Sequence, residues 1–130
     1  MVSITDKATT DVTILLVEDV DDARYFMRLE LEHLGYRVIE AGDGQKAIEL
    51  ALAEHPDIVL MDLSLPGIDG LEATRRIRQD AQMSQVPIIA VTAHMESNFN
   101  DGAKASGFDA YVTKPIDMDW LNELISGLLV

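Results

Sequence analysis

The chain has 130 residues, of which 48% are hydrophobic and 25% charged, a composition typical of one globular domain. Twenty-three acidic residues against ten Lys and Arg give a formal net charge of −13, which disfavours nucleic acids and anionic membranes as partners. Cysteine is absent, so disulfides, thiolate catalysis and cysteine-ligated metals are excluded. No apolar run exceeds four residues, so we expect neither a membrane span nor a signal peptide, and a cytoplasmic location.

Apolar runs recur along the chain after a polar, Thr-rich start. We expect residues 1–11 to form a flexible leader and residues 12–130 to form one domain. The first, third and fourth runs are continuous in Val, Ile and Leu, which is typical of strands covered on both faces. The predicted strands are residues 13–17, 36–40, 57–61, 87–91 and 109–112.

Segments with helical spacing lie between these strands. In the first, Arg24 and Arg28 fall outside the apolar stripe and Gly35 ends the helix. The stripe of this helix contains Ala23, Phe26, Met27, Leu31 and Leu34.

The later helices follow the same logic. A helix over residues 45–54 places Ala47, Ile48, Ala51 and Leu52 on one face. Asp69 and Asp117 are predicted to cap the third and the last helix, and Arg78 is expected on the inner side of the third. The segment around residues 96–106 has a thin apolar stripe and poor helix formers, so it should be the least stable helix.

Strict alternation of strands and helices predicts an α/β fold: a doubly wound, five-stranded parallel sheet of flavodoxin-like type with helices on both faces. In such sheets, ligands bind beyond the carboxyl ends of the strands. The residues that follow the strands are therefore the candidates for function.

Charged and polar side chains follow four of the five strands. They are Glu18 and Asp19, then Asp62, Thr92 and Lys114. Three carboxylates at one edge repel one another by roughly 1 to 4 kcal/mol per pair at about 4 Å, so a cation should join them. Oxygen ligands without His or Cys favour a hard ion such as Mg²⁺, and the hydroxyl and ammonium suit a phosphoryl group.

This ordered set of residues resembles the receiver domains of two-component response regulators, over about residues 13–130. The resemblance includes the acidic pair at 18–19, the stretch MDLSLPGIDG at 61–70, Thr92-Ala93, Tyr111 and Lys114-Pro115. The separations of 43, 30 and 22 residues between Asp19, Asp62, Thr92 and Lys114 fit the family.

The resemblance implies that Asp62 accepts a phosphoryl group from the phosphohistidine of a histidine kinase or histidine phosphotransfer protein. Asp19, Asp62 and the backbone carbonyl of Ser64 would hold Mg²⁺, or Mn²⁺ as a substitute, with Glu18 assisting. Lys114 and Thr92 would stabilise the transferred group, and Lys114-Pro115 would be a cis peptide.

The resemblance also implies a switch. Thr92 would move toward the phosphoryl group and Tyr111 would turn inward, changing a partner-binding face formed by the fourth helix, fifth strand and fifth helix. Ser64 and His94 occupy places that tune the lifetime of the aspartyl phosphate. The downstream protein target is not specified by the sequence, and no turnover substrate is expected.

Other readings of the sequence stay open at this point. A metal-dependent phosphohydrolase with an aspartyl nucleophile would normally carry a second Asp two residues later, where this chain has Ser64. A flavodoxin-like electron carrier would need a Ser- and Gly-rich loop after the first strand, where this chain is acidic. We expect either a stand-alone receiver or a fragment cut from a larger protein, and a stand-alone receiver could be a diffusible regulator, a phosphorelay intermediate or a phosphate sink.

Two glycines flank the loop after Asp62. Gly67 and Gly70 indicate either a flexible loop beside the acceptor or a turn with positive φ followed by tight packing.

Overall fold

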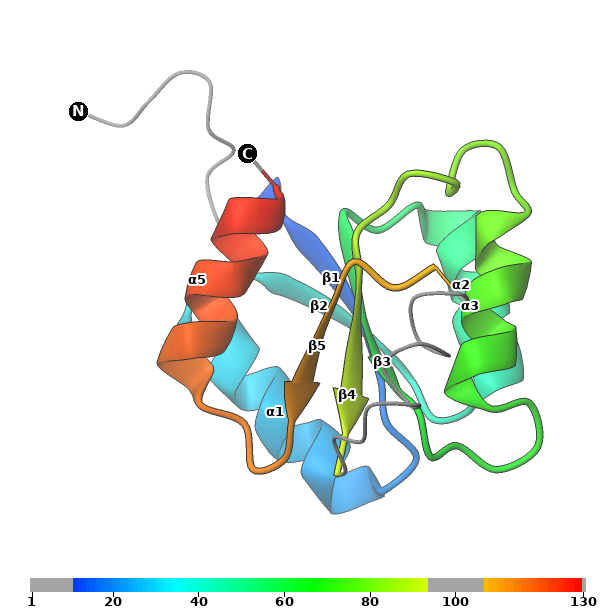
Figure 1. Cartoon of the computed structure of the whole chain (residues 1–130). Helices are drawn as coiled ribbons and strands as arrows, with labels where there is room; N and C mark the ends of the chain where they lie inside the picture. Colours follow the sequence, from blue (N-terminus) through cyan, green and yellow to red (C-terminus); the bar gives the residue numbers. More distant parts are fainter. Residues whose placement is uncertain (1–10, 94–106, 130) are drawn as a thin grey trace.

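The computed structural model describes residues 11–93 and 107–129, and within them the chain forms one parallel sheet with helices on both faces (Figure 1). The strand order is β2-β1-β3-β4-β5, which is the order of the predicted flavodoxin-like fold. The strands are β1 (Thr13–Val17), β2 (Arg37–Ala41), β3 (Ile58–Asp62), β4 (Ile88–Thr92) and β5 (Ala110–Thr113).

All five predicted strands are confirmed, and the last four begin and end one residue later than predicted. Asp62 and Thr92 consequently end their strands instead of following them. This small shift matters for the site because a residue inside the ladder has a fixed backbone, whereas a loop residue does not.

The described helices form two layers, one on each face of the sheet. They are α1 (Asp21–His33), α2 (Gly44–Glu54), α3 (Gly70–Arg78) and α5 (Met118–Leu128). α1 and α5 pack on one face, and α2 and α3 on the other (Figure 1). Among the described residues, no helix is long and apolar enough to cross a membrane. The predicted leader, except Asp11, and the predicted helix at 96–106 lie outside the described residues.

Alternate residues of each central strand enter two separate hydrophobic clusters. In β1, Ile14 and Leu16 contact the cluster under α1 and α5, while Leu15 and Val17 contact the cluster under α2 and α3. Because both faces are covered, these strands can be apolar at every position, as their composition predicts. Burial of a side chain such as Leu15 stabilises the fold by roughly 1.5–3 kcal/mol.

The predicted orientation of α1 is wrong in its first half. Ala23 and Phe26 are exposed, Phe26 to 60%, whereas Arg24 and Arg28 are partly buried. The reason is that this half of α1 lies beside Glu40 of β2, which pairs with both arginines, so the inward side is charged. Further along, Met27, Leu31 and Leu34 pack on the sheet as predicted.

In the part of the chain that the structure describes, an aspartate caps the start of each helix after α1. The predicted caps are confirmed: Asp69 accepts from the Glu72 N–H at 2.9 Å, and Asp117 from the Trp120 N–H at 3.1 Å. Asp43 caps α2 in the same way, at 2.7 Å from the Lys46 nitrogen. On α2 the predicted face is confirmed for Ala47 and Ala51, but Leu52 is exposed.

Arg78, at the end of α3, forms a cluster of polar contacts at the edge of the sheet where β4 and β5 begin. Its guanidinium donates to the Gly107 carbonyl at 2.7 Å and to Asp109 Oδ2 at 2.7 Å. It also donates to the carbonyl oxygens of Ser84 and Val86 in the turn before β4. The side chain is only 17% exposed, which confirms the predicted inward position of Arg78.

Candidate functional site

Glu18, Asp19 and Asp62 converge at the carboxyl edge of the sheet. β1 and β3 are parallel neighbours with Val17 opposite Met61, so Glu18 and Asp62 occupy equivalent places at the strand ends. One carboxylate oxygen from each of the three residues lies within 4.8 Å of the others. The prediction that folding gathers these acidic side chains at one edge is therefore confirmed.

Two of these carboxylates are buried. Asp62 is 3% exposed and Glu18 is 7% exposed, while Asp19 is the least buried of the three. Backbone N–H groups hold them: Ser64 donates to Asp62 Oδ1 at 2.9 Å and Val20 donates to Glu18 Oε2 at 3.2 Å. These donors fix the orientation of the carboxylates but carry no full charge, so the repulsion among the acidic groups remains.

Lys114 reaches the same point from the end of β5. Its Nζ lies 3.0 Å from Glu18 Oε1 and 3.5 Å from Asp62 Oδ2. Partial burial lowers the pKa of Lys114, but the hydrogen bond to Glu18 and the charges of Asp62 and Glu18 outweigh it and raise the pKa above its usual value. The ammonium therefore stays charged at neutral pH, and the Lys114-Pro115 peptide is cis, as the resemblance implies.

The donor set fits a hard divalent cation. Three carboxylates against one ammonium leave two negative charges uncompensated among these four side chains. All the converging ligands are oxygens, which Mg²⁺ prefers, and the open position of Asp19 leaves room for the waters that Mg²⁺ retains. No described contact involves the backbone carbonyl of Ser64, so its predicted role stays a prediction.

The predicted switch residues lie on one face of the sheet. Thr92 ends β4 and is buried, and its carbonyl accepts from the Lys114 N–H at 2.8 Å. Tyr111 pairs with Ala90 across β4 and β5 and packs in the cluster under α2 and α3. By strand alternation the Thr92 side chain points to this same face. Of the two residues predicted to tune the phosphoryl lifetime, Ser64 is exposed, and His94 lies outside the described residues.

In the loop after Asp62, the structure shows the second predicted alternative: a turn with positive φ at Gly67, followed by tight packing at Gly70. Gly67 has φ +71°, and a Cβ at Gly70 would lie 2.4 Å from the carbonyl oxygen of Asp62. The start of α3 thus presses directly on the last residue of β3. Arg24 could not be recognised from the sequence as a neighbour of this site, and its guanidinium donates to the Glu18 carbonyl at 2.8 Å. An Arg three residues after a helix Asp gives no signal that it contacts a neighbouring strand.

Comparison with known proteins agrees with this geometry. Residues 14–126 match the sequence model of the response regulator receiver domain. Protein PilH of Pseudomonas aeruginosa is 37% identical over 116 residues, which cover 89% of this chain and 96% of PilH. The polar-differentiation response regulator DivK of Brucella ovis is 34% identical over 117 residues, covering 90% of this chain and 95% of DivK.

A solved structure shows the same fold. The receiver domain of the sensor histidine kinase PA1611 from Pseudomonas aeruginosa has a TM-score of 0.85 and 35% identity to this chain. The match covers 91% of this chain and 97% of that domain, which was solved with a magnesium ion coordinated in its active site cleft. The chain belongs to the response regulator receiver domain family, the phosphoacceptor modules of two-component signal transduction.

Proposed function

We propose that Asp62 is the phosphoacceptor of this receiver domain, which we take to span residues 12–130. The donor would be the phosphohistidine of a histidine kinase or histidine phosphotransfer protein. One carboxylate oxygen of Asp62 attacks phosphorus, so a P–O bond forms while the P–N bond breaks and the imidazole leaves with its electron pair. The convergence of three carboxylates within 4.8 Å beside the Lys114 ammonium is the observation that carries this proposal.

The residues around Asp62 would bind the metal ion and stabilise the phosphoryl group. Glu18, Asp19, Asp62 and the Ser64 carbonyl would hold Mg²⁺, for which Mn²⁺ can substitute. When bound, the ion neutralises phosphoryl oxygens that gain charge in the transition state. Lys114 donates to the phosphoryl oxygens from the side of β5, and the Thr92 hydroxyl donates from β4. Such a site transfers one phosphoryl group to itself, and we propose that it turns over no separate substrate.

Phosphorylation by a small donor tests the acceptor assignment. Purified protein is incubated with acetyl phosphate and Mg²⁺, and its intact mass is measured. We expect the mass of one phosphoryl group to be added to the wild type and to Asp69→Asn, but not to Asp62→Asn. Asp69→Asn is the matched control because Asn caps a helix as well as Asp does, and Asp69 only caps α3. Undiminished labelling of Asp62→Asn would refute the proposal.

We further propose that phosphorylation changes the surface formed by the predicted fourth helix, β5 and α5. Two observations support this: Thr92 and Tyr111 share a face of the sheet, and Trp120 in the first turn of α5 is exposed. We also propose that Ser64 and His94 tune the lifetime of the aspartyl phosphate. The downstream protein target would bind more strongly to the phosphorylated form.

A binding assay with beryllofluoride tests the switch, since this anion imitates the phosphoryl group on Asp62. Wild type and Asp62→Asn are each immobilised with and without beryllofluoride and Mg²⁺, and bound proteins are identified. We expect a partner that binds the wild type only with beryllofluoride and does not bind Asp62→Asn in either condition. Equal capture in all four arms would contradict a phosphorylation-dependent surface.

A further inference from the structure

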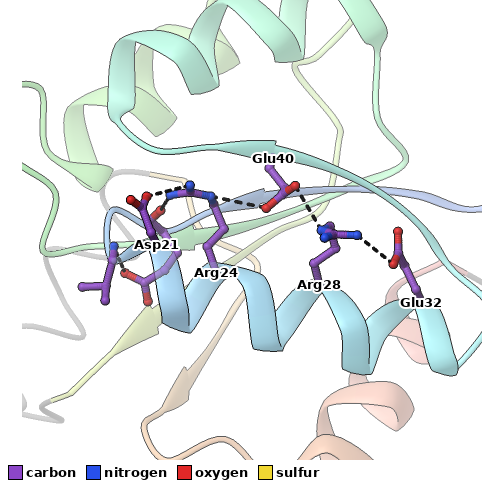
Figure 2. A network of polar contacts seen from close by, with 7 residues as sticks. Asp21, Arg24, Arg28, Glu32 and Glu40 are labelled. Carbon is purple, nitrogen blue, oxygen red and sulfur yellow. Dashed lines mark hydrogen bonds and ion pairs between the residues drawn. The ribbon is translucent and has the colours of Figure 1, made fainter.

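A chain of ion pairs joins α1 to the end of β2 beside the acidic site (Figure 2). Glu40 of β2 receives two arginines, with its Oε1 3.4 Å from Arg24 Nε and its Oε2 3.1 Å from Arg28 Nε. Each arginine also pairs within the helix, Arg24 with Asp21 at 2.8 Å and Arg28 with Glu32 at 3.0 Å. The two arginines therefore share Glu40 but differ in two contacts: the Arg28 guanidinium lies 5.3 Å from the centre of the Tyr25 ring, and of the two only Arg24 has a contact beyond Glu40 and its own helix within the described part of the chain.

That contact connects Arg24 to the loop that carries the acidic residues. Arg24 Nη1 donates to the main-chain carbonyl of Glu18 at 2.8 Å, whereas Arg28 forms no such bond to this loop among the described residues. The N–H of the same Glu18 donates to the carbonyl of Ala41 at 3.1 Å. Glu18 is thus held on both sides of its Cα, by β2 and by α1.

The guanidinium fits closely into the space between these elements. The Arg24 side chain is 20% exposed, and a Cβ at Gly42 would lie 3.2 Å from its Nη1. Arg24 contacts three parts of the fold: it donates hydrogen bonds to Glu18 at the end of β1 and to Asp21 in the first turn of α1, and it forms an ion pair with Glu40 of β2. Only a planar fork with several fixed donors serves three such acceptors at once; a lysine ammonium has a different shape and a shorter reach.

We infer that Arg24 is a positioning residue that sets the main-chain path at Glu18 and Asp19 so that their carboxylates converge on Asp62. The inference rests on the proposed function, because it assigns Arg24 to the metal site of the phosphoacceptor. Arg24 itself contacts neither Asp62 nor Lys114 through any described bond. Its effect passes through the backbone of Glu18.

The sign of the effect on metal affinity separates positioning from simple electrostatics. A cation beside an acidic site repels Mg²⁺, so removing the charge of Arg24 would tighten Mg²⁺ binding if charge were its only role. Loss of positioning has the opposite result, because outer contacts that orient metal ligands are typically worth about 10- to 100-fold in affinity. The two explanations therefore predict changes in opposite directions.

Mg²⁺ titration by calorimetry on the full chain tests the inference. We expect the Kd of Arg24→Met to rise about 10-fold or more, and that of Arg24→Lys to rise although its charge is kept. Arg28→Met is the matched control: it removes the same charge and the same partner Glu40, one turn along the helix, and should leave the Kd within about twofold or lower it. Tighter or unchanged binding by Arg24→Met, or equal weakening by both methionine variants, would overturn the inference.

Amide hydrogen exchange without metal provides a second readout that does not depend on Mg²⁺ binding. Exchange at the N–H groups of Glu18 and Val20 should be faster in Arg24→Lys and Arg24→Met, and unchanged in Arg28→Met. If the wild type binds no Mg²⁺, the proposed function fails, while exchange still decides whether Arg24 orders the loop. Exchange that is equal in all the proteins would overturn the positioning role even if metal affinity had changed.

Discussion

Two charged clusters lie at opposite edges of the same sheet, and they are built differently. Where β4 and β5 begin, one guanidinium, that of Arg78, meets one carboxylate, Asp109, and several neutral carbonyls. Where β1, β3 and β5 end, three carboxylates meet one ammonium. The Arg78 cluster is balanced in charge and rich in hydrogen bonds, whereas the acidic cluster keeps an excess of negative charge.

The difference indicates that the Arg78 cluster stabilises the fold, whereas the acidic cluster is suited to bind a cation. A partly buried cation with all its neighbours satisfied lowers the free energy of the folded state. A group of like charges held together raises it, and that cost is recovered only when a cation arrives. Substitutions at the two edges should therefore separate stability from metal affinity.

The largest effect is expected at the balanced edge. Arg78→Met removes the donor shared by the turn before β4 and the start of β5, and should lower the free energy of unfolding by roughly 3 kcal/mol. The acidic cluster lies at the other edge, so the Mg²⁺ affinity of the folded protein should not change. Urea unfolding and Mg²⁺ calorimetry on the same sample measure the two quantities. If the Kd for Mg²⁺ rose together with the loss of stability, the two clusters would not separate stability from metal affinity.

A smaller loss is expected where α3 presses on the site. In Gly70→Ala the new Cβ would meet the Asp62 carbonyl, so the free energy of unfolding should fall by roughly 2 kcal/mol and Mg²⁺ should bind more weakly. Gly127→Ala on α5 is the control, because nothing lies within 4 Å of its added Cβ. It should raise stability by about 0.5 kcal/mol. Equal behaviour of the two variants in urea would show that contact at Gly70 is unimportant.

The same chemical change should have opposite signs at the two edges. Without metal, Asp62→Asn relieves repulsion and should raise the free energy of unfolding by about 1 kcal/mol. Asp109→Asn removes the charged partner of Arg78 and should lower it by about 1 kcal/mol. Thermal unfolding in the presence of a chelator measures both. Adding Mg²⁺ should then stabilise the wild type and Asp109→Asn, but barely affect Asp62→Asn. If Asp62→Asn were less stable than the wild type without metal, repulsion among the excess negative charges would not be what destabilises this cluster.

The smallest effect concerns the titration of Lys114. Glu18→Gln removes the hydrogen-bonded charge that raises the pKa of Lys114, so this pKa should fall; nuclear magnetic resonance of the lysine Cε measures it without metal. Because the pKa is raised on folding, the stabilisation by Lys114 is fully present below the pKa of an unfolded lysine and is lost as the pH rises through the folded value. Asp69→Asn, outside the cluster, should leave this titration unchanged.

The parts of the site that depend on sheet topology could be predicted from the sequence. The ends of parallel strands share one edge, so recognising the strands is enough to predict that Asp19, Asp62 and Lys114 lie at the same edge of the sheet. The side of α1 that packs on the sheet could not be predicted in its first half. Hydrophobic spacing treats Arg24 as a solvent-exposed residue and contains no information about Glu40, sixteen residues away. The role of Gly70 could not be predicted for a similar reason, because the sequence does not show whether a glycine gives a loop flexibility or allows a close contact.

The missing Cβ at Gly70 also has a mechanical consequence. The last peptide of β3 is enclosed by its neighbours β1 and β4 and by the first turn of α3, so the backbone of Asp62 has almost no freedom to yield. Under the proposed function, a phosphoryl group on Asp62 would then displace neighbouring side chains rather than the Asp62 backbone. A chemical change at this one residue would in that way be passed on to other parts of the molecule.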